Sequence, residues 1–391
     1  MITSSAPLGE LVEIRGGGTP SKARAEFYRN GSVPWVTPKD MKKWDIDSSI
    51  DRITEQALEN STAKLIPPNS VLVVIRSGVL KHSLPVGISR VPLAVNQDLK
   101  ALICGREVYP QYLGRFLRAR APVILRSVRG TTADNISTAV LKQLEIPLPP
   151  LAEQKRIAGI LDAADALRAK RRESLAQLDT LIQATFLDMF GDPVTNPKGW
   201  DVVPFESLGK SRLGKMLDAA KQTDEDRCPY LANLNVQWNR FVLDDLREMT
   251  FTKADRAEFA LEHGDLLICE GGEVGRTAIW RGEMENVFFQ KALHRVRLEP
   301  DLAVPEFVLW FMWFMAEHGG FSDFTTSATI AHLTGVKLKR LPVPLPPVRL
   351  QRQFASIFES IDEHREQQTE YRSDLDALFS SLQARAFAGE L

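Results

Sequence analysis

Residues 146–161 read IPLPPLAEQKRIAGIL, and residues 343–358 read VPLPPVRLQRQFASIF. The two stretches align at every position with a constant offset of 197, and they share the Pro-Pro pair and a glutamine, Gln154 and Gln351. Weaker matches precede them in the same order, such as residues 71–73 and 266–268 at an offset of 195. Self-similarity of this kind indicates that the chain is a tandem repeat.

Both halves have the same internal order. Short β-rich runs between Gly, Pro and Asn turns come first, and the Pro-rich stretch and a long helical pattern follow. The sequence therefore predicts an α+β fold: two globular α/β domains in a tandem pseudo-repeat, joined by two long antiparallel coiled-coil helices. We expect the first domain at residues 1–150, the first helix at 151–195, the second domain at 196–345 and the second helix at 346–391.

A coiled-coil seam with a polar middle runs along each long helix, with alternating spacings of three and four residues. In the second helix we place the seam at Phe354, Ile357, Ile361, His364, Gln368, Tyr371, Leu375, Leu378 and Leu382. The positions 197 residues earlier give the first seam: Ile157, Ile160, Ala164, Leu167, Arg171, Ser174, Leu178, Leu181 and Thr185. We expect the two helices to pack together and to hold the domains at a fixed separation. The alternative is that each helix docks only on its own domain.

The composition is that of a globular chain. The 391 residues are 44% hydrophobic and 25% charged, and the three cysteines form no CxxC pair, which favours a reducing compartment. The first residues carry no basic and apolar signal segment, and the longest apolar run, 307–316, is about half of a bilayer span. We therefore expect a cytoplasmic protein without membrane contact.

Motifs for catalysis and cofactor binding are missing from the sequence. It contains no HExxH motif, and its six histidines show no metal-ligand spacing. The stretch EGGEVGRT at 270–277 imitates a phosphate-binding loop, but Glu270 replaces the first glycine and Arg276 replaces the lysine. No Asn-Pro-Pro-aromatic tetrapeptide of the amino-methyltransferase type occurs. We expect a non-catalytic chain with no metal or cofactor of its own.

The formal net charge of −1 conceals a partition between segments. Residues 1–150 carry +7 and residues 196–345 carry −4, so the first domain favours a polyanion. Lys and Arg bind DNA phosphates, and Arg, Asn and Gln also read base edges. The candidate DNA-binding residues are Arg15, Thr19, Lys22, Lys39, Lys42, Lys43, Trp44, Arg76, Lys81, Arg126, Arg129, Lys210, Arg212, Lys215, Asn233, Asn235, Gln237, Arg240 and Arg276. The alternative for each of them is an ordinary solvated surface position.

Two motifs carry a resemblance to a known family. Residues 147–157, PLPPLAEQKRI, and the junction MFGDP (189–193) followed by NPKGW (196–200) resemble the specificity subunit of type I restriction-modification systems. The resemblance spans nearly the whole chain. The second copy departs from the pattern, because Arg349-Leu350-Gln351 stands where the first copy has Ala-Glu-Gln.

The resemblance implies a non-catalytic DNA-binding subunit. Its two target recognition domains would each read one half of a bipartite target in double-stranded DNA, and its helices would set the spacing and dock two methyltransferase (modification) subunits. Restriction (helicase-nuclease) subunits would complete the complex, and S-adenosylmethionine, ATP and Mg²⁺ would belong to these partners. The candidate partner-binding residues are Glu153, Gln154, Arg156, Gln351 and Arg352.

Two other functions remain open at this stage. The chain is compatible with the specificity subunit of a methylation-only or type IIB-like system, which would lack a separate restriction subunit. It is also compatible with a coiled-coil interaction scaffold whose globular repeats bind protein instead of DNA.

Overall fold

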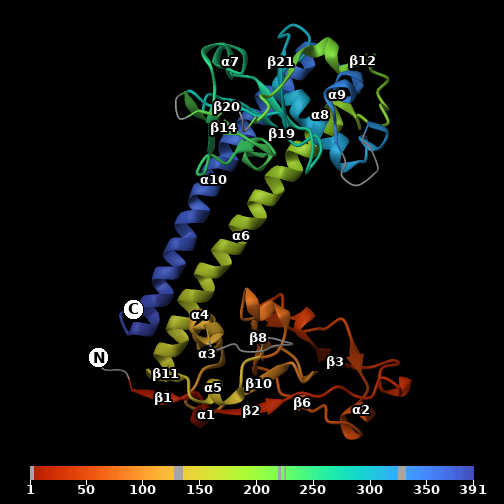
Figure 1. The fold of residues 1–391 in the computed structure, drawn as a ribbon. Helices are drawn as coiled ribbons and strands as arrows, with labels where there is room; N and C mark the ends of the chain where they lie inside the picture. Colours follow the sequence, from red (N-terminus) through yellow and green to blue (C-terminus); the bar gives the residue numbers. More distant parts are fainter. Residues whose placement is uncertain (1–3, 127–134, 219–221, 224–225, 325–331) are drawn as a thin grey trace. The chain divides into compact units, whose positions relative to one another are not determined.

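The computed structural model describes residues 4–126, 135–218, 222–223, 226–324 and 332–391 (Figure 1). Its contacts divide the chain into two compact units, which we describe separately. Unit 1 comprises Met1–Arg172 and Glu370–Leu391, and unit 2 comprises Glu173–Thr369. The division falls within both long helices, so each unit contains one globular domain and a part of each helix.

The described residues of unit 1 form three sheets, and the largest has the strand order β2-β10-β7-β8-β4. Its inner strand β7 reads VLVV and is buried along its whole length, because α3 packs against β7 and β8. The strands are β1 (Ser5–Pro7), β2 (Val12–Gly16), β3 (Val33–Val36), β4 (Asp45–Ile46), β5 (Arg52–Ile53), β6 (Leu65–Ile66), β7 (Val71–Val74), β8 (Val86–Ser89), β9 (Leu93–Val95), β10 (Leu99–Cys104) and β11 (Glu145–Pro147). The short helices are α1 (Leu8–Leu11), η1 (Ala25–Phe27), η2 (Pro38–Asp40), α2 (Glu55–Glu59), η3 (Gly78–Lys81), α3 (Pro110–Ala119), α4 (Ala121–Arg126) and α5 (Thr138–Lys142).

Unit 2 repeats this plan with a four-stranded sheet of order β13-β21-β18-β19. The apolar run at 307–316 forms α8, which is buried against β19 and the long helices. The strands are β12 (Val202–Pro204), β13 (Gly209–Leu213), β14 (Arg227–Leu231), β15 (Val236–Gln237), β16 (Arg240–Phe241), β17 (Arg247–Thr250), β18 (Leu266–Cys269), β19 (Thr277–Ile279), β20 (Phe288–Phe289), β21 (Leu293–Leu298) and β22 (Pro342–Pro344). The short helices are η4 (Phe205–Leu208), η6 (Asn233–Asn235), α7 (Lys253–Glu258), α8 (Pro305–Glu317), η7 (Ser322–Phe324) and α9 (Gly335–Arg340).

The repeat is visible in the strand pairing. In unit 1, β1 pairs antiparallel with β11 and Ala6 lies opposite Ile146; in unit 2, β12 pairs antiparallel with β22 and Val203 lies opposite Val343. Both members of the second pair lie 197 residues after their counterparts. The tandem mixed α/β architecture predicted from the sequence is therefore confirmed.

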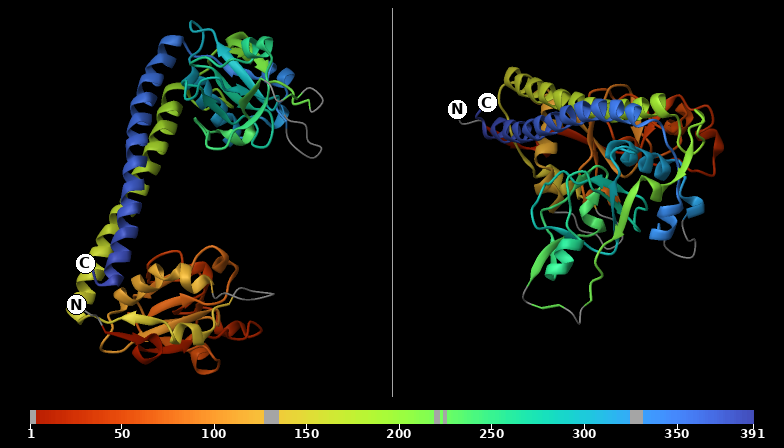
Figure 2. Two further views of the ribbon diagram at one scale, coloured as in Figure 1. Left: turned by 60° about the vertical axis from the view of Figure 1, so that its left-hand side comes forward. Right: turned by 90° about the horizontal axis from the view of Figure 1, so that it is seen from above.

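The two long helices are α6 (Leu151–Phe190) and α10 (Val348–Ala388). In unit 1, Arg168 of α6 contacts Asp376 of α10 at 2.6 Å, and Arg171 lies over the ring of Tyr371. In unit 2, the rings of Phe186 and Phe354 pack with their centroids 5.4 Å apart. Within each unit the helical segments therefore lie side by side and antiparallel, as predicted (Figures 1 and 2).

Both helices also dock on the globular domain of unit 1. Phe387 of α10 packs against Tyr112 and Phe116 of α3 with centroid distances of 5.4 and 5.2 Å. Arg115 of α3 bonds to Asp162 and Asp165 of α6. Helix pairing and docking on a domain are thus not alternatives, because the same helices do both.

The predicted seam is out of phase with the buried face at several positions. In α10, Phe354, Ile361 and Leu375 face inward as expected, but Ile357 is 42% exposed and Phe358 is only 1% exposed. The same one-residue error occurs in α6, where Leu161 and Ile182 are buried and the predicted Leu167 and Leu181 are exposed. The phase of the seam follows from the way each long helix packs at its start. In the second copy this packing buries residues 351, 354 and 358.

Two negative findings apply to the described ranges. None of their helices combines the length and apolar character that crossing a bilayer requires. They also contain no group of three or more His, Cys, Asp or Glu side chains arranged to hold a metal ion.

Candidate nucleic-acid interface

A groove of about 890 Å³ in unit 1 lies among η2, η3 and the α3–α4 corner. Its lining includes Lys42, His82, Arg118 and Leu125. Several sequence-predicted cations lie on these same three segments: Lys39 and Lys43 beside Lys42, Lys81 beside His82, and Arg126 beside Leu125. Folding thus brings Lys42, His82 and Arg118 together in the lining of one groove, which we call the basic groove, and the other four cations lie on the segments that border it.

The lysines on these segments differ in whether a carboxylate pairs with them. Lys42, Lys43 and Lys81 are exposed, and none forms a hydrogen bond or ion pair with another described residue. Lys39 instead forms an ion pair with Asp51 at 2.7 Å, and this hydrogen bond raises the pKa of Lys39. The three lysines without a carboxylate partner among the described residues are therefore more available to an external anion than Lys39.

Trp44 forms part of the wall behind this groove. Its ring lies 4.4 Å from the guanidinium of Arg115 and 4.3 Å from that of Arg118, which are typical cation–π distances. Arg118 also donates to the carbonyl of Val86 at 2.7 Å, and burial lowers its pKa to about 10, so it remains charged at neutral pH. The indole of Trp44 is half-buried against these two arginines, and its contact with DNA stays a prediction.

Buried Arg115 links this wall to the long helix. Its guanidinium bonds to Asp162 and Asp165 of α6, both at 2.7 Å. Burial opposes ionisation of Asp165, but the hydrogen bond from Arg115 and the charges of Arg115, Arg118 and Arg168 outweigh it, so the pKa of Asp165 is lowered. The cluster fixes α3, and with it the groove, to α6.

The remaining unit 1 candidates are placed elsewhere. Arg15 on β2 bonds to Glu13 at 2.6 Å, and Arg76 bonds to Asp98 at 2.6 Å. Thr19 bonds to Gln97, so Thr19 and Arg76 both contact the turn before β10. Lys22 is exposed, and Arg129 lies outside the described residues.

Unit 2 has a groove of about 1000 Å³ beside β13. Its lining includes the predicted Arg212 and Lys215. However, Arg212 contacts Glu258, and Lys215 bonds to Asp255 at 2.6 Å and to the carbonyl of Thr250. Both cations are therefore paired with carboxylates of the same domain.

The amide-rich stretch of unit 2 is mainly structural. Asn235 is buried, accepts from the Ala232 amide and donates to the carbonyl of Val242, which corrects its assignment to DNA. Asn233 donates to the carbonyl of Gly271, and Arg276 donates to the carbonyl of Asn233 at 2.7 Å. Gln237 donates to the carbonyl of Leu234.

Unit 2 also has exposed cations. Lys210 on β13 and Arg240 on β16 were identified from the sequence, and neither side chain bonds to another described residue. Lys339, which lines the groove, was missed. The signal that could have found it is the basic run of residues 337–340, KLKR.

The shared glutamines have an internal role. Gln154 is fully buried; it accepts from the Tyr109 amide and donates to the carbonyls of Glu107 and Pro149. In unit 2, Gln351 repeats this pattern with the Val304 amide and the carbonyls of Leu302 and Pro346. The prediction that both glutamines face a partner protein is wrong. Every polar atom of the two side chains forms a hydrogen bond within its own unit.

The other partner-binding candidates lie at the surface. Glu153 and Arg156 form an ion pair one turn apart on α6 at 2.6 Å. Their mutual hydrogen bond lowers the pKa of Glu153 and raises that of Arg156. Arg352 is exposed on α10 and donates to the carbonyl of Pro300 at 2.9 Å.

The helix pair carries two equivalent ion pairs that sequence reasoning missed. Arg168 bonds to Asp376 at 2.6 Å in unit 1, and Arg365 lies 3.7 Å from Asp179 in unit 2. The two arginines are 197 residues apart, and so are the two aspartates. The sequence signal that could have found these pairs is the recurrence of the arginine and of the aspartate at the repeat offset of 197.

Comparison with known proteins agrees with the repeat. A family model described as "Type I restriction modification DNA specificity domain" matches this chain twice, over residues 5–178 and 197–371.

Three known specificity subunits are similar in sequence. The EcoR124I/EcoR124II type I restriction enzyme specificity subunit of Escherichia coli is 42% identical over 170 residues, which cover 43% of this chain and 42% of that protein. The MjaIX specificity subunit of Methanocaldococcus jannaschii is 28% identical over 53% of this chain and 50% of its own length. The EcoKI specificity subunit of Escherichia coli strain K12 is 25% identical over 99% and 88%. The chain thus spans half or less of the length of the first two relatives.

Two solved structures have a similar fold. The type I restriction-modification S subunit from M. genitalium gives a TM-score of 0.58 at 16% identity and covers 98% of this chain and 96% of that one. A chain of a type I R-M system gives a TM-score of 0.61 at 17% identity, with coverage of 99% and 98%. At this identity the likeness supports the fold.

Proposed function

The chain belongs to the type I restriction modification DNA specificity family, and on that premise we propose that it is the subunit that recognises a specific DNA sequence in a restriction-modification complex. The observation that carries the proposal is the duplicated domain with a basic groove in unit 1. Each domain reads one half of a bipartite target. Phosphate contacts position the duplex, and exposed side chains at the grooves read it.

Unit 1 supplies most of the electrostatic affinity in this proposal. Residues 1–150 carry a net charge of +7, and Lys42, Lys43 and Lys81 are free beside the first groove. The second domain carries −4, and acidic neighbours occupy Arg212 and Lys215. Binding of the second half-site therefore depends more on shape and on assembly with partner subunits.

The helices serve as spacer and docking surface in the same proposal. The antiparallel pairing in each unit, held by Arg168–Asp376 and Arg365–Asp179, supports a fixed gap between half-sites. The helix surfaces dock two methyltransferase subunits, and restriction subunits join the full complex. Chemistry that needs S-adenosylmethionine, ATP or Mg²⁺ belongs to these partners, and this chain, acting in the cytoplasm where the DNA lies, contributes no catalytic residue.

The test uses the chain assembled with its methyltransferase subunits. Binding of labelled duplexes is measured across a salt series, and methylated positions are mapped on genomic DNA from cells carrying the system. We expect one bipartite methylated sequence and affinity that falls steeply with salt. Binding without sequence selectivity at every salt concentration would contradict DNA recognition and favour a protein scaffold.

A further inference from the structure

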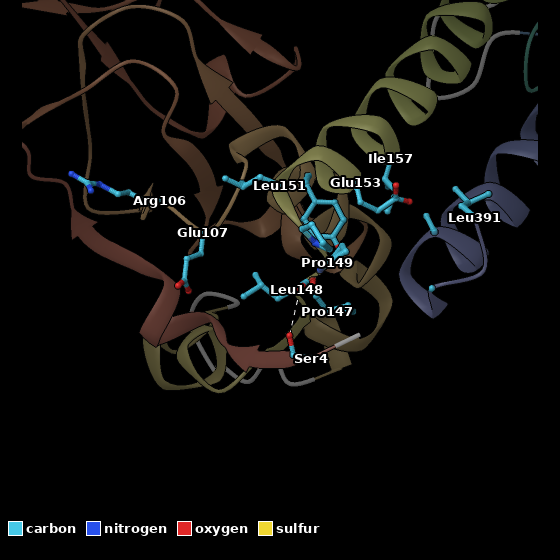
Figure 3. A pocket seen from close by; sticks show the side chains of 14 residues that line it. Ser4, Arg106, Glu107, Pro147, Leu148, Pro149, Leu151, Glu153, Ile157 and Leu391 are labelled. Carbon is cyan, nitrogen blue, oxygen red and sulfur yellow. Dashed lines mark hydrogen bonds between the residues drawn. The ribbon is translucent and has the colours of Figure 1, made fainter. Parts of the chain in front are cut away.

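Each long helix is attached to its own domain at two levels. The first is the start of the helix, where the shared glutamines bond to backbone groups of the domain. In unit 1 the hydroxyl of Ser4 also donates to the carbonyl of Leu148, just before α6 begins (Figure 3). The second level lies eleven residues after each glutamine, at Asp165 of α6 and Asp362 of α10, and these two aspartates are 197 residues apart.

In unit 1, Asp165 divides its two carboxylate oxygens between the helix and the domain. Oδ1 accepts from Arg168, one turn further along α6, at 3.1 Å, and Oδ2 accepts from Arg115 of α3 at 2.7 Å. Arg168 also bonds to Asp376 of α10. The guanidinium of Arg115 lies over the ring of Trp44, which directly follows two exposed lysines at the basic groove. A chain of contacts therefore runs from the helix pair to a segment that carries free cations.

In unit 2, Asp362 divides its oxygens in the same way. Oδ1 accepts from Arg365, one turn further along α10, and Oδ2 accepts from the side-chain amide of Asn239 at 3.0 Å. Arg365 also lies 3.7 Å from Asp179 of α6. Asn239 is in the turn between β15 and β16, and exposed Arg240 follows it directly. The second chain of contacts thus also runs from the helix pair to a candidate DNA-binding residue.

The domain ends of the two chains of contacts are equivalent positions in the repeat. Trp44 directly precedes β4 and Asn239 directly precedes β16, and the two residues are related by the offset of 195 that also relates β7 to β18. The side chains that reach the aspartate differ, because the counterpart of Arg115 by this offset is the uncharged Trp310. Two unlike domains therefore make the same attachment with different residues.

The surroundings of Asp362 make it an effective anchor for this turn. Its side chain is buried, so its hydrogen bonds are shielded from water and from salt. Arg281 lies 3.8 Å from the carboxylate and donates to Oδ1 of Asn239 at 3.3 Å, which closes a small polar network. The carboxylate therefore constrains where the turn, and Arg240 beside it, lies relative to α10.

We propose that Asp165 and Asp362 are positioning residues for DNA recognition, each of which fixes the cation-bearing segment of its own domain against the helix pair. The inference rests on the proposed function, in which the helices set the gap between the half-sites. A segment that is tied to the helices meets its half-site in a defined register. Each aspartate acts through the segment that it holds, and not by contact with DNA.

The test uses the chain assembled with its methyltransferase subunits and three duplexes. One duplex carries both half-sites of the mapped target, and in each of the others one half-site is substituted. Discrimination at a half-site is the ratio of the affinities for the intact and the substituted duplex. We expect Asp362→Ala to reduce discrimination at one half-site about tenfold and to leave the other unchanged, and Asp165→Ala to have the reverse effect.

Three further variants separate positioning from stability. Asn239→Gly keeps the positive φ of 53° in the turn but removes the contact with Asp362, so it should reproduce the effect of Asp362→Ala. Val343→Ala opens a cavity at a fully buried position of β22 in the same unit, and it should lower the melting temperature without changing discrimination. Glu363→Ala, at the exposed neighbouring position of α10, should change neither.

The proposal is overturned if the wild-type complex is selective but discrimination is unchanged in Asp362→Ala and Asn239→Gly, or if each aspartate variant weakens both half-sites equally. It is also overturned if Val343→Ala reduces discrimination as much as Asp362→Ala, because the stability of the unit then accounts for the effect. A wild-type complex without any selectivity would instead contradict the proposed DNA recognition, and the positioning role with it.

Discussion

At the scale of single residues, the basic groove separates free cations from paired ones. Lys42 and Lys43 are exposed and lack partners among the described residues, whereas Lys39 is held by Asp51. A charge is available to phosphate only when no carboxylate nearby has already neutralised it. The sequence marks all three as one cluster, and only the fold distinguishes them.

The first prediction concerns these lysines. Lys42→Gln with Lys43→Gln should weaken binding to all DNA sequences about tenfold and reduce the slope of log affinity against log salt by roughly two, because each lysine releases about one counterion. Lys39→Gln should have a smaller effect. Lys170→Gln, an exposed position on α6, is the control. Binding is measured by fluorescence anisotropy across a salt series. An effect of Lys39→Gln as large as that of the Lys42 and Lys43 substitutions would contradict the distinction between the paired lysine and the free ones.

The second prediction concerns Asp165, which receives hydrogen bonds from buried Arg115 and from Arg168. Asp165→Asn should lower the free energy of unfolding of unit 1 by about 1.5–3 kcal/mol at pH 7, the range for hydrogen bonds to charged groups.

The pH dependence of this effect has a definite sign. Because the folded-state pKa of Asp165 is lowered, its stabilisation is complete above the ordinary carboxyl value of 3.8 and is lost as the pH falls below it. Urea titrations at pH 7 and near pH 3 should show the difference between wild type and variant shrinking at the lower pH. A difference independent of pH would show that Asp165 acts through packing alone.

At the scale of elements, the glutamine after the Pro-rich stretch joins each long helix to its domain. Gln154 and Gln351 each make three hydrogen bonds to backbone groups. The sequence predicts a partner-binding role for this glutamine in both copies. Its contacts instead hold the start of each long helix against the loop that precedes α3 in unit 1 and α8 in unit 2.

The third prediction follows from these contacts. Gln154→Leu and Gln351→Leu should each destabilise their unit by about 2–4 kcal/mol, because a buried amide donor and two carbonyls lose their partners. Differential scanning calorimetry should show one transition lowered in each variant. The control is Gln353→Leu, an exposed position on the same turn of α10. A control effect as large as that of Gln351→Leu would indicate a general change in helix propensity.

The fourth prediction tests the phase of the seam. Phe358→Ala should cost about 3–5 kcal/mol in unit 2, because it opens a cavity beside Phe354, whereas Ile357→Ala should cost under about 0.5 kcal/mol. Chemical denaturation of the two variants measures both values. A larger loss of stability for Ile357→Ala than for Phe358→Ala would contradict the observed phase and support the seam predicted from the sequence.

The sequence was sufficient for the repeat, the fold class and the long helices, because those depend on periodicity and on Pro-rich boundaries. It was insufficient for the phase of the seam, since Ile357 and Phe358 are both apolar and only docking of the helix start selects between them. It also could not separate buried Asn235 from exposed Arg240, because the burial of Asn235 depends on the conformation of the turn in which its side chain bonds to Ala232 and Val242.

At the scale of the whole molecule, one family model matches the chain twice, and in the proposed function each matched domain reads one half-site. Replacing residues 1–150 with a recognition domain of different specificity should therefore change one half of the methylated sequence and leave the other half unaltered. Methylation mapping in cells carrying the hybrid gene measures the outcome. A change in both halves would contradict independent reading by the two domains.

The equivalent ion pairs of the helices have a genetic consequence. Each arginine finds its aspartate in the other repeat: Arg168 with Asp376, and Arg365 with Asp179. Because both repeats encode the same two charges at the same register, a crossover that exchanges one repeat for the other leaves both pairs intact. A recombined chain would therefore keep both ion pairs between its two long helices.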